Sequence, residues 1–497
     1  MRDIFKTIQA NILKILLMSV ILFFMSGYFL INSTSVDVSF LDNEYKILIK
    51  KYLFPYTTIS QQEQVIKDQE HLINEQAQIV NERAKSLSEQ IIQEQNSKFQ
   101  ELQIIVNQIS TLLELTYMEL GSDIEIKKTS VNLLENLTLE KFQLLSGFYS
   151  GINNNYPGSG YIEFHNDNII VMSSKGLLAY KTNLIDDTEK FKQIKTNINE
   201  FIGMEQFRKN EIFAWFSIKD ILIFNETIFV SFTEEIKNDC WNTSIASADM
   251  DYENIKFTKL FSSQECIHSV NNVDGQFNAH QSGGRIISFD NNHILFSTGD
   301  YRSRHLAQNK KSVNGKVVKL NLLNGSYEII SMGHRNPQGL YFDKVNNIIL
   351  ETEHGPQGGD EINKIEVSKI YQDELQNYGW AISSAGEHYG GKTEKNKELY
   401  EKYPLHDSHS EHGYIEPVKS FVPSIGISEI VKIGKNKFVV SSLKDKSIYF
   451  FEIDEKGLLF NLNRVEVFER IRDLKFKNNQ LYLFMEDTAS IGVIDLG

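Results

Sequence analysis

The stretch IISFDNNHILFS, residues 286–297, alternates apolar and polar side chains on both sides of an Asn-Asn pair. Period-two alternation around an Asn turn is typical of a β-hairpin, because successive side chains of a strand point to opposite faces. Five more stretches repeat this pattern, each with a large apolar residue just before its turn. They are YIEFHNDNIIVM (161–172), ILIFNETIFVSF (221–232), LYFDKVNNIILE (340–351), EIVKIGKNKFVVS (429–441) and DLKFKNNQLYLF (473–484).

Six such hairpins, irregularly spaced and separated by long insertions, favour an all-β six-bladed β-propeller over a solenoid. Each hairpin would form the inner part of one blade, and the blades would pack around a central channel. We therefore expect the propeller domain to cover residues 147–497. A large β-sandwich is the alternative architecture. The insertion at 361–429 shows no pattern that we could interpret.

The N-terminal third of the chain has a different character. Residues 56–120 contain no glycine or proline, and apolar residues recur there with 3/4 spacing, which predicts a long helix with a coiled-coil seam. We assign residues 36–146 to a helical, coiled-coil stalk that would join copies of the chain into a homo-oligomer. An intramolecular helical hairpin and a plain spacer helix are the alternatives. The seam comprises Ile66, Ile73, Val80 and Leu87 at seven-residue intervals, then, after a phase slip, Phe99, Leu102, Val106, Ile109 and Leu113.

An apolar run at residues 15–31 follows three basic residues. Its length suits a transmembrane helix, and the preceding positive charges favour a cytoplasmic N-terminus. Residues 1–35 are therefore expected to form a cytoplasmic end and a single-pass anchor in the inner membrane, with the rest of the chain in the periplasm. The alternative is a cleaved signal peptide, which would also export the chain.

The chain of 497 residues has a formal net charge of -14, which argues against nucleic acid as a partner. Its two cysteines, Cys240 and Cys266, stand at the start of one predicted strand and at the end of the next. In an antiparallel pair those positions meet, and an oxidising compartment would preserve a disulfide. Two unpaired buried thiols are the alternative.

Polar motifs stand where the predicted hairpins begin or end. The loop GHRNPQGL, residues 333–340, precedes one hairpin, and Asn278–Gln281 precedes another. In a propeller such loops crowd one end of the channel. They would bring Arg335, Lys444, Arg470 and Arg472 into a positive pocket, which suits a small polyanion.

The order of these motifs resembles the soluble glucose/sorbosone dehydrogenases, which are quinoprotein aldose dehydrogenases. The resemblance covers roughly residues 147–497 and is strongest from 278 to 473. The motifs are AHQSGGRI (279–286), STGD (297–300), GHRNPQGL (333–340), EHGPQGGDEINKI (353–365), NYGWA (377–381), SSLK (441–444) and RIRD (470–473).

The resemblance implies a six-bladed propeller that uses pyrroloquinoline quinone (PQQ) and calcium. His280 matches the base that takes a proton from the sugar C1 hydroxyl while hydride passes to the quinone. Alone it would be read as a packed loop histidine. Asp300 matches the carboxylate that orients this base. Arg335 and Asn336 match residues that contact the quinone, with Arg335 stabilising its developing negative charge.

Further positions match groups that hold the cofactor and metal. Lys444, Arg470 and Arg472 match the cations that pair with the cofactor carboxylates. Gly355 and Pro356 match backbone carbonyls that bind the active-site calcium. Two more positions, Glu361 and Tyr378, resemble ligands of a second, structural calcium; the alternative is a surface carboxylate and a core aromatic residue.

One departure concerns the second blade, where the family has a glutamine that contacts sugar or cofactor. The comparable stretch here, FAWFSIKDILIF (213–224), contains none. The stretch 150–182, expected to be the first blade, is only weakly similar. Substrate recognition is therefore expected to differ, or activity to be lost.

The leading hypothesis is a membrane-anchored, PQQ- and calcium-dependent dehydrogenase that oxidises an aldose at C1 to the lactone and passes electrons to an unidentified acceptor. A non-catalytic propeller that binds carbohydrate or a protein partner is the alternative. A calcium-dependent lactonase-type propeller would need acidic side chains on the channel axis, and we expect no such cluster from the sequence.

Overall fold

The computed structural model describes residues 59–134, 136–145, 147–148, 160–182, 184, 190–208, 215–454 and 457–497. The expected transmembrane segment, residues 15–31, and the expected first domain, residues 1–35, lie outside these ranges. Within them, no helix combines the length and the apolar character needed to cross a membrane. The chain divides into two compact units, Met1–Phe99 and Gln100–Gly497, and each is described by itself.

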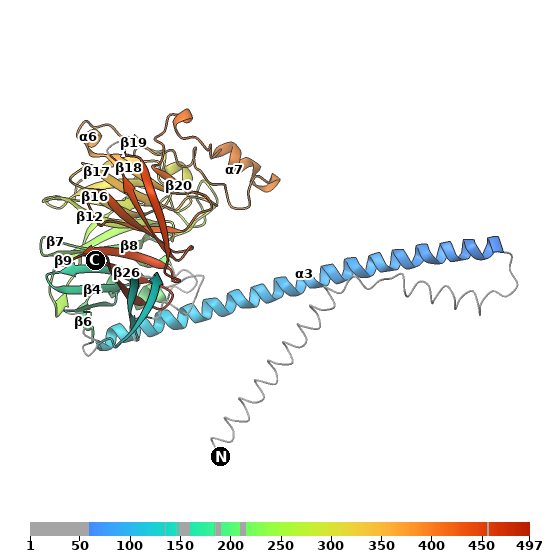
Figure 1. The fold of residues 1–497 in the computed structure, drawn as a ribbon, viewed down its shortest axis with the longest axis horizontal. Coiled ribbons are helices and arrows are strands. Elements are labelled where there is room, and N and C mark those ends of the chain that lie inside the picture. Colours follow the sequence, from blue (N-terminus) through green and yellow to red (C-terminus); the bar gives the residue numbers. More distant parts are fainter. Residues whose placement is uncertain are drawn as a thin grey trace, which may run out of the picture. The chain divides into compact units, whose positions relative to one another are not determined.

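The strands of the second unit form six sheets within the described residues (Figure 1). One strand from each sheet lies innermost, and these strands contact one another in a closed ring in the order β3, β7, β12, β16, β21 and β25. A closed ring of sheets is a propeller. The predicted six-bladed β-propeller is therefore confirmed, and the β-sandwich alternative is wrong.

The blades are numbered by their inner strands. Blade 1 contains β3 (Gly160–His165), β4 (Asn168–Ser173), β5 (Leu178–Lys181), β6 (Lys192–Thr196) and β10 (Asn254–Ile255). Blade 2 contains β7 (Ile218–Phe224), β8 (Thr227–Lys237), β9 (Cys240–Asp249) and β11 (Thr258–Ser262). Blade 3 contains β12 (Gly283–Asp290), β13 (His293–Thr298), β14 (Lys316–Asn321), β15 (Tyr327–Met332) and β19 (Gln376–Asn377).

The remaining blades follow in chain order. Blade 4 contains β16 (Pro337–Asp343), β17 (Ile348–Glu353), β18 (Asp360–Glu366) and β20 (Lys419–Phe421). Blade 5 contains β21 (Ile427–Lys432), β22 (Lys437–Ser442), β23 (Ser447–Ile453) and β24 (Leu459–Glu466). Blade 6 contains β25 (Ile471–Lys477), β26 (Gln480–Met485), β27 (Ser490–Asp495), β2 (Leu137–Leu144) and β1 (Ile126–Leu134).

All six predicted hairpins are present, each as the inner and second strand of its blade. The turn between β25 and β26 shows why Asn marks them: Asn478 and Asn479 have φ of +52° and +62°. Two successive positive φ angles make the type I′ turn, whose twist matches that of the flanking strands. Asn tolerates this backbone conformation better than most residues.

The predicted start of the propeller, residue 147, is wrong. Residues 126–144, which we expected in the helical stalk, form β1 and β2, and β2 pairs with the C-terminal strand β27. A strand from the beginning of the domain therefore closes the last blade. Most of β1 is exposed, so it lacks the apolar alternation by which the other strands were recognised.

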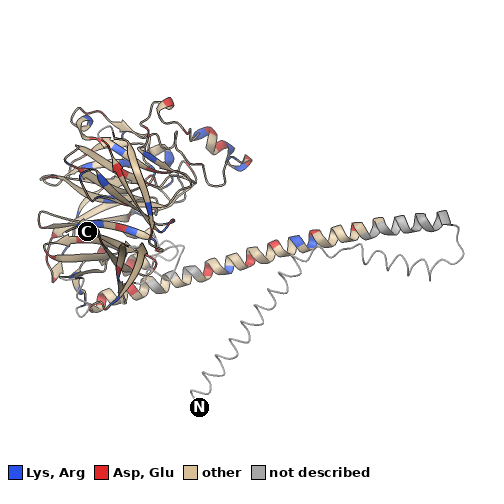
Figure 2. Ribbon diagram, viewed as in Figure 1, with Lys and Arg blue, Asp and Glu red and all other residues tan. Residues whose placement is uncertain are grey.

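The predicted long helix is confirmed as α3 (Ile59–Leu120), 62 residues in length. Basic and acidic residues both recur along its described part (Figure 2). Apolar seam residues are exposed, among them Val80 at 64% and Leu87 at 58%. A coiled coil needs a second helix against this seam, so the coiled coil itself stays a prediction. The last turns of α3, which belong to the second unit, bury Leu115 and Glu114.

The shorter helices lie between strands, and the insertion at 361–429 completes two blades. Its strand β19 joins blade 3 and its strand β20 joins blade 4. The short helices are α4 (Asn199–Ile202), α5 (Met204–Phe207), η3 (Arg304–Leu306), α6 (Val367–Ile370), η4 (Glu394–Asn396), α7 (Lys397–Lys402) and η5 (Ser410–His412).

Cys240 and Cys266 form a disulfide, with their Cα atoms 5.1 Å apart. The neighbouring residues Trp241 and Ile267 exchange backbone hydrogen bonds, which holds the two cysteines opposite each other. Of the two alternatives from the sequence, the bonded pair is therefore the one found.

Candidate functional site

The loops that precede the inner strands meet at one end of the central channel. The backbone N–H of Gly283, which opens β12, donates to Oδ1 of Asn336, 3.1 Å away. The N–H of Asp300 donates to the carbonyl of Arg335. From blade 6, a guanidinium nitrogen of Arg472 donates to Oε1 of Gln338 at 2.8 Å. Four of the motifs singled out in the sequence are thus joined directly.

His280, the predicted base, lies in the loop before β12. Its backbone N–H donates to Oδ1 of Asn278 at 2.9 Å, which forms a tight turn. Its side chain is exposed, yet burial by the surrounding protein is the largest cause that lowers its pKa, to about 3. A side chain that lines a recess can be accessible to solvent and still be surrounded by protein atoms on most sides. The positive charges of Lys219, Lys175 and Arg472 add to the lowering. The lowered pKa keeps the imidazole neutral near pH 7, and it also makes the imidazole a weaker base while these positive charges lack a counter-charge.

Asp300, the predicted orienting carboxylate, is fully buried. It accepts hydrogen bonds from Trp380 Nε1 at 2.7 Å, from the Arg302 backbone N–H at 2.8 Å and from Gln281 Nε2 at 2.5 Å. Burial raises its pKa, although Arg335 and Arg304 oppose the change. Through these contacts Asp300 fixes Gln281, the residue after His280; direct orientation of the imidazole stays a prediction.

Arg335 and Asn336 are both buried in the loop that enters β16. The Arg335 guanidinium donates to the carbonyl of His354 at 2.8 Å and lies over the ring of Trp380, 5.5 Å from its centroid. Nδ2 of Asn336 lies 3.5 Å from Nδ1 of His354. Both residues are therefore fixed at the same end of the channel as His280.

Arg470 and Arg472 share one buried carboxylate. Their Nε atoms lie 3.0 and 2.7 Å from the two oxygens of Glu486, which is fully buried at the end of β26. One acid thus orients two guanidinium groups and leaves the trio with a positive charge. Sequence reasoning missed Glu486, although an acid that ends the apolar run LYLFM was a visible signal. The fourth predicted cation, Lys444, has an exposed side chain, and its N–H donates to the carbonyl of Ile425.

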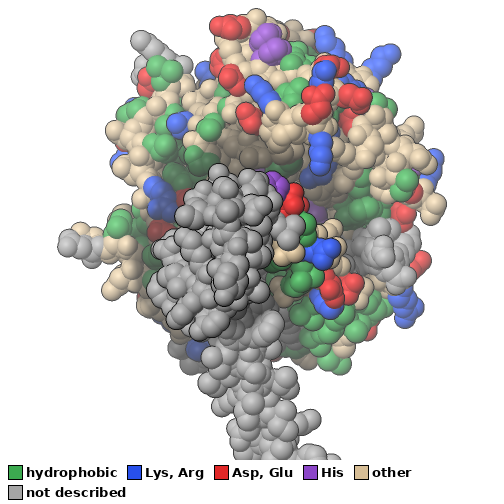
Figure 3. All heavy atoms as spheres, turned by 90° about the vertical axis from the view of Figure 1, so that its right-hand side faces the viewer, with side chains coloured by type: hydrophobic (Ala, Val, Ile, Leu, Met, Phe, Trp, Pro, Cys, Tyr) green, Lys and Arg blue, Asp and Glu red, His purple; other side chains and the backbone are tan. Residues whose placement is uncertain are grey.

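His354 lies near three of these cations, and their charges affect its pKa. Burial, followed by the charges of Arg472, Arg335 and Arg470, lowers its pKa to about 3. Its Nε2 atom is buried without a hydrogen-bond partner among the described residues. One face of the molecule is hollowed near its middle, with histidine, acidic and basic side chains beside the hollow (Figure 3). We call the end of the channel that holds His280, Arg335, Arg470 and Arg472 the cationic mouth.

Gly355 and Pro356, the predicted calcium ligands, are buried in the loop after β17. The N–H of Gly355 donates to Oδ1 of Asp360 at 3.2 Å, and the other oxygen of Asp360 accepts from the backbone of Gly426 and Ile427. The Pro356 carbonyl accepts a long bond, 3.4 Å, from the N–H of Gly359. Backbone carbonyls in a pinned loop are hard oxygen donors of the kind that calcium prefers.

Blade 4 also holds an acidic cluster, made of Glu351, Glu353, Glu361 and Asn363. These residues lie on one face, because Glu351 pairs with Asn363 and Glu353 pairs with Glu361 across β17 and β18. Burial and the charge of Glu353 raise the pKa of Glu351 and of Glu361. Among the described residues, only histidines lie within ion-pair distance of these carboxylates.

The acidic cluster has the chemistry of a hard-cation site. Ligand atoms of His334, Glu351 and Glu353 lie within 4.8 Å of one another. Oε1 of Glu351 and Oδ1 of Asn363 are buried without a hydrogen-bond partner among the described residues. Free oxygens in an acidic, buried pocket suit calcium. The signal that sequence reasoning missed is the pair of acids in ILETE, at positions where a strand interior is normally apolar.

Of the two predicted structural-calcium ligands, Glu361 belongs to the acidic cluster. The ring of Tyr378 stacks on His334, with centroids 5.0 Å apart, and its hydroxyl donates to the carbonyl of Lys364 at 2.5 Å. The side chain of Tyr378 therefore supports His334, and a role in binding metal stays a prediction for this residue.

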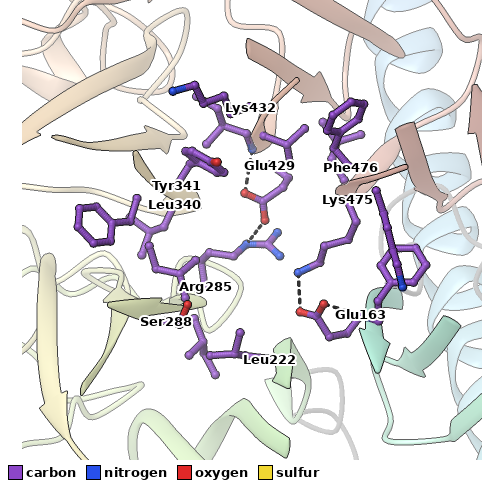
Figure 4. A pocket seen from close by; sticks show the side chains of 18 of the residues that line it. Glu163, Leu222, Arg285, Ser288, Leu340, Tyr341, Glu429, Lys432, Lys475 and Phe476 are labelled. Carbon is purple, nitrogen blue, oxygen red and sulfur yellow. Dashed lines mark hydrogen bonds and ion pairs between the residues drawn. The ribbon is translucent and has the colours of Figure 1, made fainter. Parts of the chain in front are cut away.

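Acidic side chains also lie on the channel axis, where we expected none. Asp220, Glu429 and Asp473 surround Arg285 at 2.8, 2.6 and 2.8 Å, and we call these four residues the channel floor. Arg285 and Glu429 line a cavity of about 470 Å³ on the inner strands, and so do Lys475 and its partner Glu163 (Figure 4). Because a guanidinium already occupies the centre of these acids, they do not offer the metal site of a lactonase-type propeller.

The chain resembles known sugar dehydrogenases in sequence and in fold. It is 26% identical over 233 residues to the aldose sugar dehydrogenase YliI of Escherichia coli, which covers 42% of this chain and 57% of that protein. It is 34% identical over 131 residues to quinoprotein glucose dehydrogenase B of Acinetobacter calcoaceticus, covering 20% of this chain and 26% of that one. The E. coli soluble aldose sugar dehydrogenase in its apo form superimposes with a TM-score of 0.52 at 18% identity, over 68% of this chain and 99% of that chain.

The matched segment spans only about half the length of the E. coli relative. The glucose/sorbosone dehydrogenase family model, in contrast, matches residues 223–493, from blade 2 to the last strand of blade 6. This match covers more than half of the chain and includes the cationic mouth, the acidic cluster and the channel floor almost entirely. The chain therefore belongs to the glucose/sorbosone dehydrogenase family.

Proposed function

We propose that this protein is a quinoprotein that oxidises an aldose-type sugar at C1 to the lactone, with PQQ and calcium as cofactors. The observation that carries the proposal is the convergence of cations from separate blades beside a neutral histidine. Arg335 precedes blade 4, while Arg470 and Arg472 open blade 6. The Arg335 guanidinium donates to the carbonyl of His354, Arg472 donates to Gln338 three residues after Arg335, and Arg470 shares Glu486 with Arg472.

The residues of the cationic mouth suit a planar molecule that bears carboxylates. Guanidinium groups bind carboxylates in a bidentate manner. Glu486 holds Arg470 and Arg472 through Nε, and one terminal nitrogen of Arg472 donates to Oε1 of Gln338. Asn336 and the unpartnered Nε2 of His354 offer further polar contacts. Arg472, Arg470, Arg335 and Lys444 would thus hold the cofactor, and the carbonyls of Gly355 and Pro356 would hold its calcium.

In this proposal the chain supplies proton transfer and charge stabilisation. A ring nitrogen of His280 takes the proton of the sugar C1 hydroxyl, which its neutral form allows. Arg335, held by the His354 carbonyl and the Trp380 ring, stabilises negative charge on the acceptor oxygen. Bound PQQ would supply the two-electron acceptor for hydride from C1, and calcium would polarise it.

Turnover tests this proposal. The full chain is loaded with PQQ and calcium, and reduction of an artificial dye is followed with a panel of aldoses. Dye reduction that needs both cofactors supports the proposal. Failure of every aldose at saturating cofactor would contradict it.

The second candidate is a non-catalytic propeller that binds carbohydrate or a protein partner. The absence of the expected glutamine in blade 2 favours it. The distinguishing result is tight PQQ binding by a chain that turns over no sugar.

We further propose that residues 15–31 anchor the chain in the cytoplasmic membrane and that the propeller lies in the periplasm. The disulfide between Cys240 and Cys266 supports export, because such bonds persist in oxidising compartments. Protease treatment of spheroplasts is the test. Degradation of the propeller is expected, and its protection until lysis would contradict a periplasmic location.

The exposed seam of α3 supports a homo-oligomer formed through a coiled coil. Sedimentation of the full chain is expected to give a dimer or trimer. Leu87→Glu should shift it to the monomer, whereas Leu323→Glu, at an exposed site of the propeller, should not. A monomeric wild-type chain would remove this part of the proposal.

A further inference from the structure

Lys219 stands in the stretch where the family glutamine is missing, and the structure places it beside the predicted base. It is the second residue of β7, the inner strand of blade 2. Its neighbour Asp220 points into the channel floor and binds Arg285. Lys219 lies where the register of β7 against β8 shifts, between Ile218 and Asp220, so the position of its side chain follows from its neighbours rather than from strand alternation.

The stem of Lys219 packs against Gly284, the second residue of β12, just after the loop that holds His280. A Cβ added to Gly284 would lie 2.3 Å from Cβ of Lys219 and 2.9 Å from its Cγ. Any side chain at position 284 would therefore displace the lysine. Gly284 follows His280 by four residues, so the glycine lets Lys219 lie close to the base.

Lys219 differs from the neighbouring cations Lys175 and Arg472, because each of these interacts with a nearby carboxylate. Lys175 donates to the carbonyl of Phe216 at 2.5 Å and interacts with the buried Glu114, and Arg472 is paired with Glu486. Among the described residues, no carboxylate forms an ion pair with Lys219 within 4 Å. Burial, then the charges of Arg472 and Lys175, lower the pKa of Lys219 to about 7, and the charge of Glu486 only partly opposes this change. An anion beside this ammonium would relieve the repulsion.

We infer that Lys219 selects an aldose that carries its own negative charge, as a uronic acid does at C6. This inference rests on the proposed function, because it assigns the charge to the substrate of that reaction. The cations assigned to the cofactor are Arg335, Lys444, Arg470 and Arg472, and Lys219 is additional to them. Its stem contacts Gly284, four residues after His280, and its charge lowers the pKa of His280. Since His280 is the proposed base for the sugar, we assign this extra charge to the sugar side of the site.

The test compares D-glucuronate with D-glucose on the full chain loaded with PQQ and calcium. Wild type should have the higher kcat/KM for glucuronate. Lys219→Gln should lower the glucuronate-to-glucose ratio about 10- to 100-fold, the usual value of a hydrogen bond to a charged group. The change should appear mainly in KM. Lys219→Arg keeps the charge and should keep most of the preference.

Two further measurements make the result specific. The dissociation constant of PQQ should be the same in wild type and Lys219→Gln. Lys344→Gln removes a lysine from the cavity next to the channel floor, and it should leave the sugar preference unchanged. Calorimetry of glucuronate and glucose on the loaded chain measures the same preference without turnover.

The outcomes separate this inference from the proposed function. A preference for glucose, in turnover and in binding, overturns the inference and leaves the dehydrogenase intact. Weaker PQQ binding by Lys219→Gln with an unchanged sugar ratio also overturns it, because the lysine would then serve the cofactor. Selective binding of glucuronate that depends on Lys219, without any turnover, supports the inference while the proposed function fails.

Discussion

Two regions of the propeller gather charge of opposite sign, and one short loop separates them. His334 faces the acidic cluster of blade 4, and the next residue, Arg335, faces the cationic mouth. In each region, like charges are held close together in a buried or recessed setting. Such an arrangement is costly unless a ligand of opposite charge completes it. The mouth therefore points to an anion and the cluster to a cation.

The channel floor provides the contrast. Arg285 lies within 2.8 Å of all three of its acids, and Lys475 pairs with Glu163 beside it. Each of these acids already has a cationic partner inside the protein, although the three acids outnumber Arg285. Charge alone consequently does not mark a ligand site. Buried polar atoms without a partner among the described residues, such as Oε1 of Glu351 and Nε2 of His354, distinguish the other two regions.

The largest expected effect is at the base of the cationic mouth. His280→Ala should lower kcat about 10²- to 10⁴-fold, because a positioned general base contributes that much. PQQ affinity should change little, since the cations that hold the cofactor remain. Stopped-flow dye reduction and PQQ titration measure the two quantities. Wild-type kcat in this variant would remove His280 from the reaction.

The channel floor should depend on its own arginine. Arg285→Met should lower the free energy of unfolding by about 3–5 kcal/mol, because it leaves three buried acids without a counter-charge. Neither PQQ nor calcium should restore the loss. In the control Arg464→Met, which breaks a half-exposed pair with Asp445, the cost should stay below about 1 kcal/mol. Equal costs in denaturant titrations would contradict the contrast drawn here.

Arg335→Gln tests the anion side of the shared loop. Loss of a donor that stabilises developing charge should lower kcat about 10²- to 10³-fold. Stability should change little, because the loop backbone keeps its bonds from Asp300 and to Glu353. Arg464→Gln serves as the control for loss of an arginine. Steady-state kinetics and thermal unfolding give both values, and unchanged kcat would contradict the assigned role.

Calcium tests the cation side of that loop. Calcium at about 100 times its dissociation constant should stabilise the chain by about 2.7 kcal/mol, and a chelator should reverse this. Glu351→Gln should reduce the calcium response, whereas Glu366→Gln, at a half-exposed position of the same blade, should not. Thermal unfolding with and without calcium is the measurement. An equal response in both variants would exclude the acidic cluster as the site.

The smallest effect is a shift in titration. The pKa of His280 is lowered to about 3, so in the cofactor-free chain its imidazole should remain neutral at pH values well below 6.5. A bound anion offsets the charges of Lys219, Lys175 and Arg472, so PQQ should raise this pKa. Histidine NMR signals followed between pH 3 and 8 would show the change. A fall on PQQ binding would contradict the proposed position of the anion.

The parts of the fold that depend on local pattern could be predicted from the sequence. Every inner hairpin can be recognised by alternating apolar and polar residues around a short turn. Asn478 and Asn479, which form one of these turns, have the positive φ angles that Asn favours. Strand β1 does not, because most of its residues are exposed. Strand β2 pairs with β27, about 350 residues later in the chain, and such a long-range partner has no local signal.

The residues of the candidate site also fall into those that the sequence could predict and those that it could not. Ring closure alone predicts that the loops before the inner strands meet, so His280, Arg335 and Arg472 could be placed together. Glu486 and Lys219 could not, because their roles depend on which way a side chain leaves its strand and on what lies across the channel. The acidic cluster required the register of β17 against β18, which the sequence does not encode locally.

The central claim is that the cationic mouth binds an anionic quinone. Equilibrium titration of the full chain with PQQ at saturating calcium tests it most directly, with Arg472→Gln beside the wild type. The account predicts saturable binding of one PQQ per chain and markedly weaker binding by the variant. Absence of saturable binding to the wild type, or equal affinity in both proteins, would contradict it.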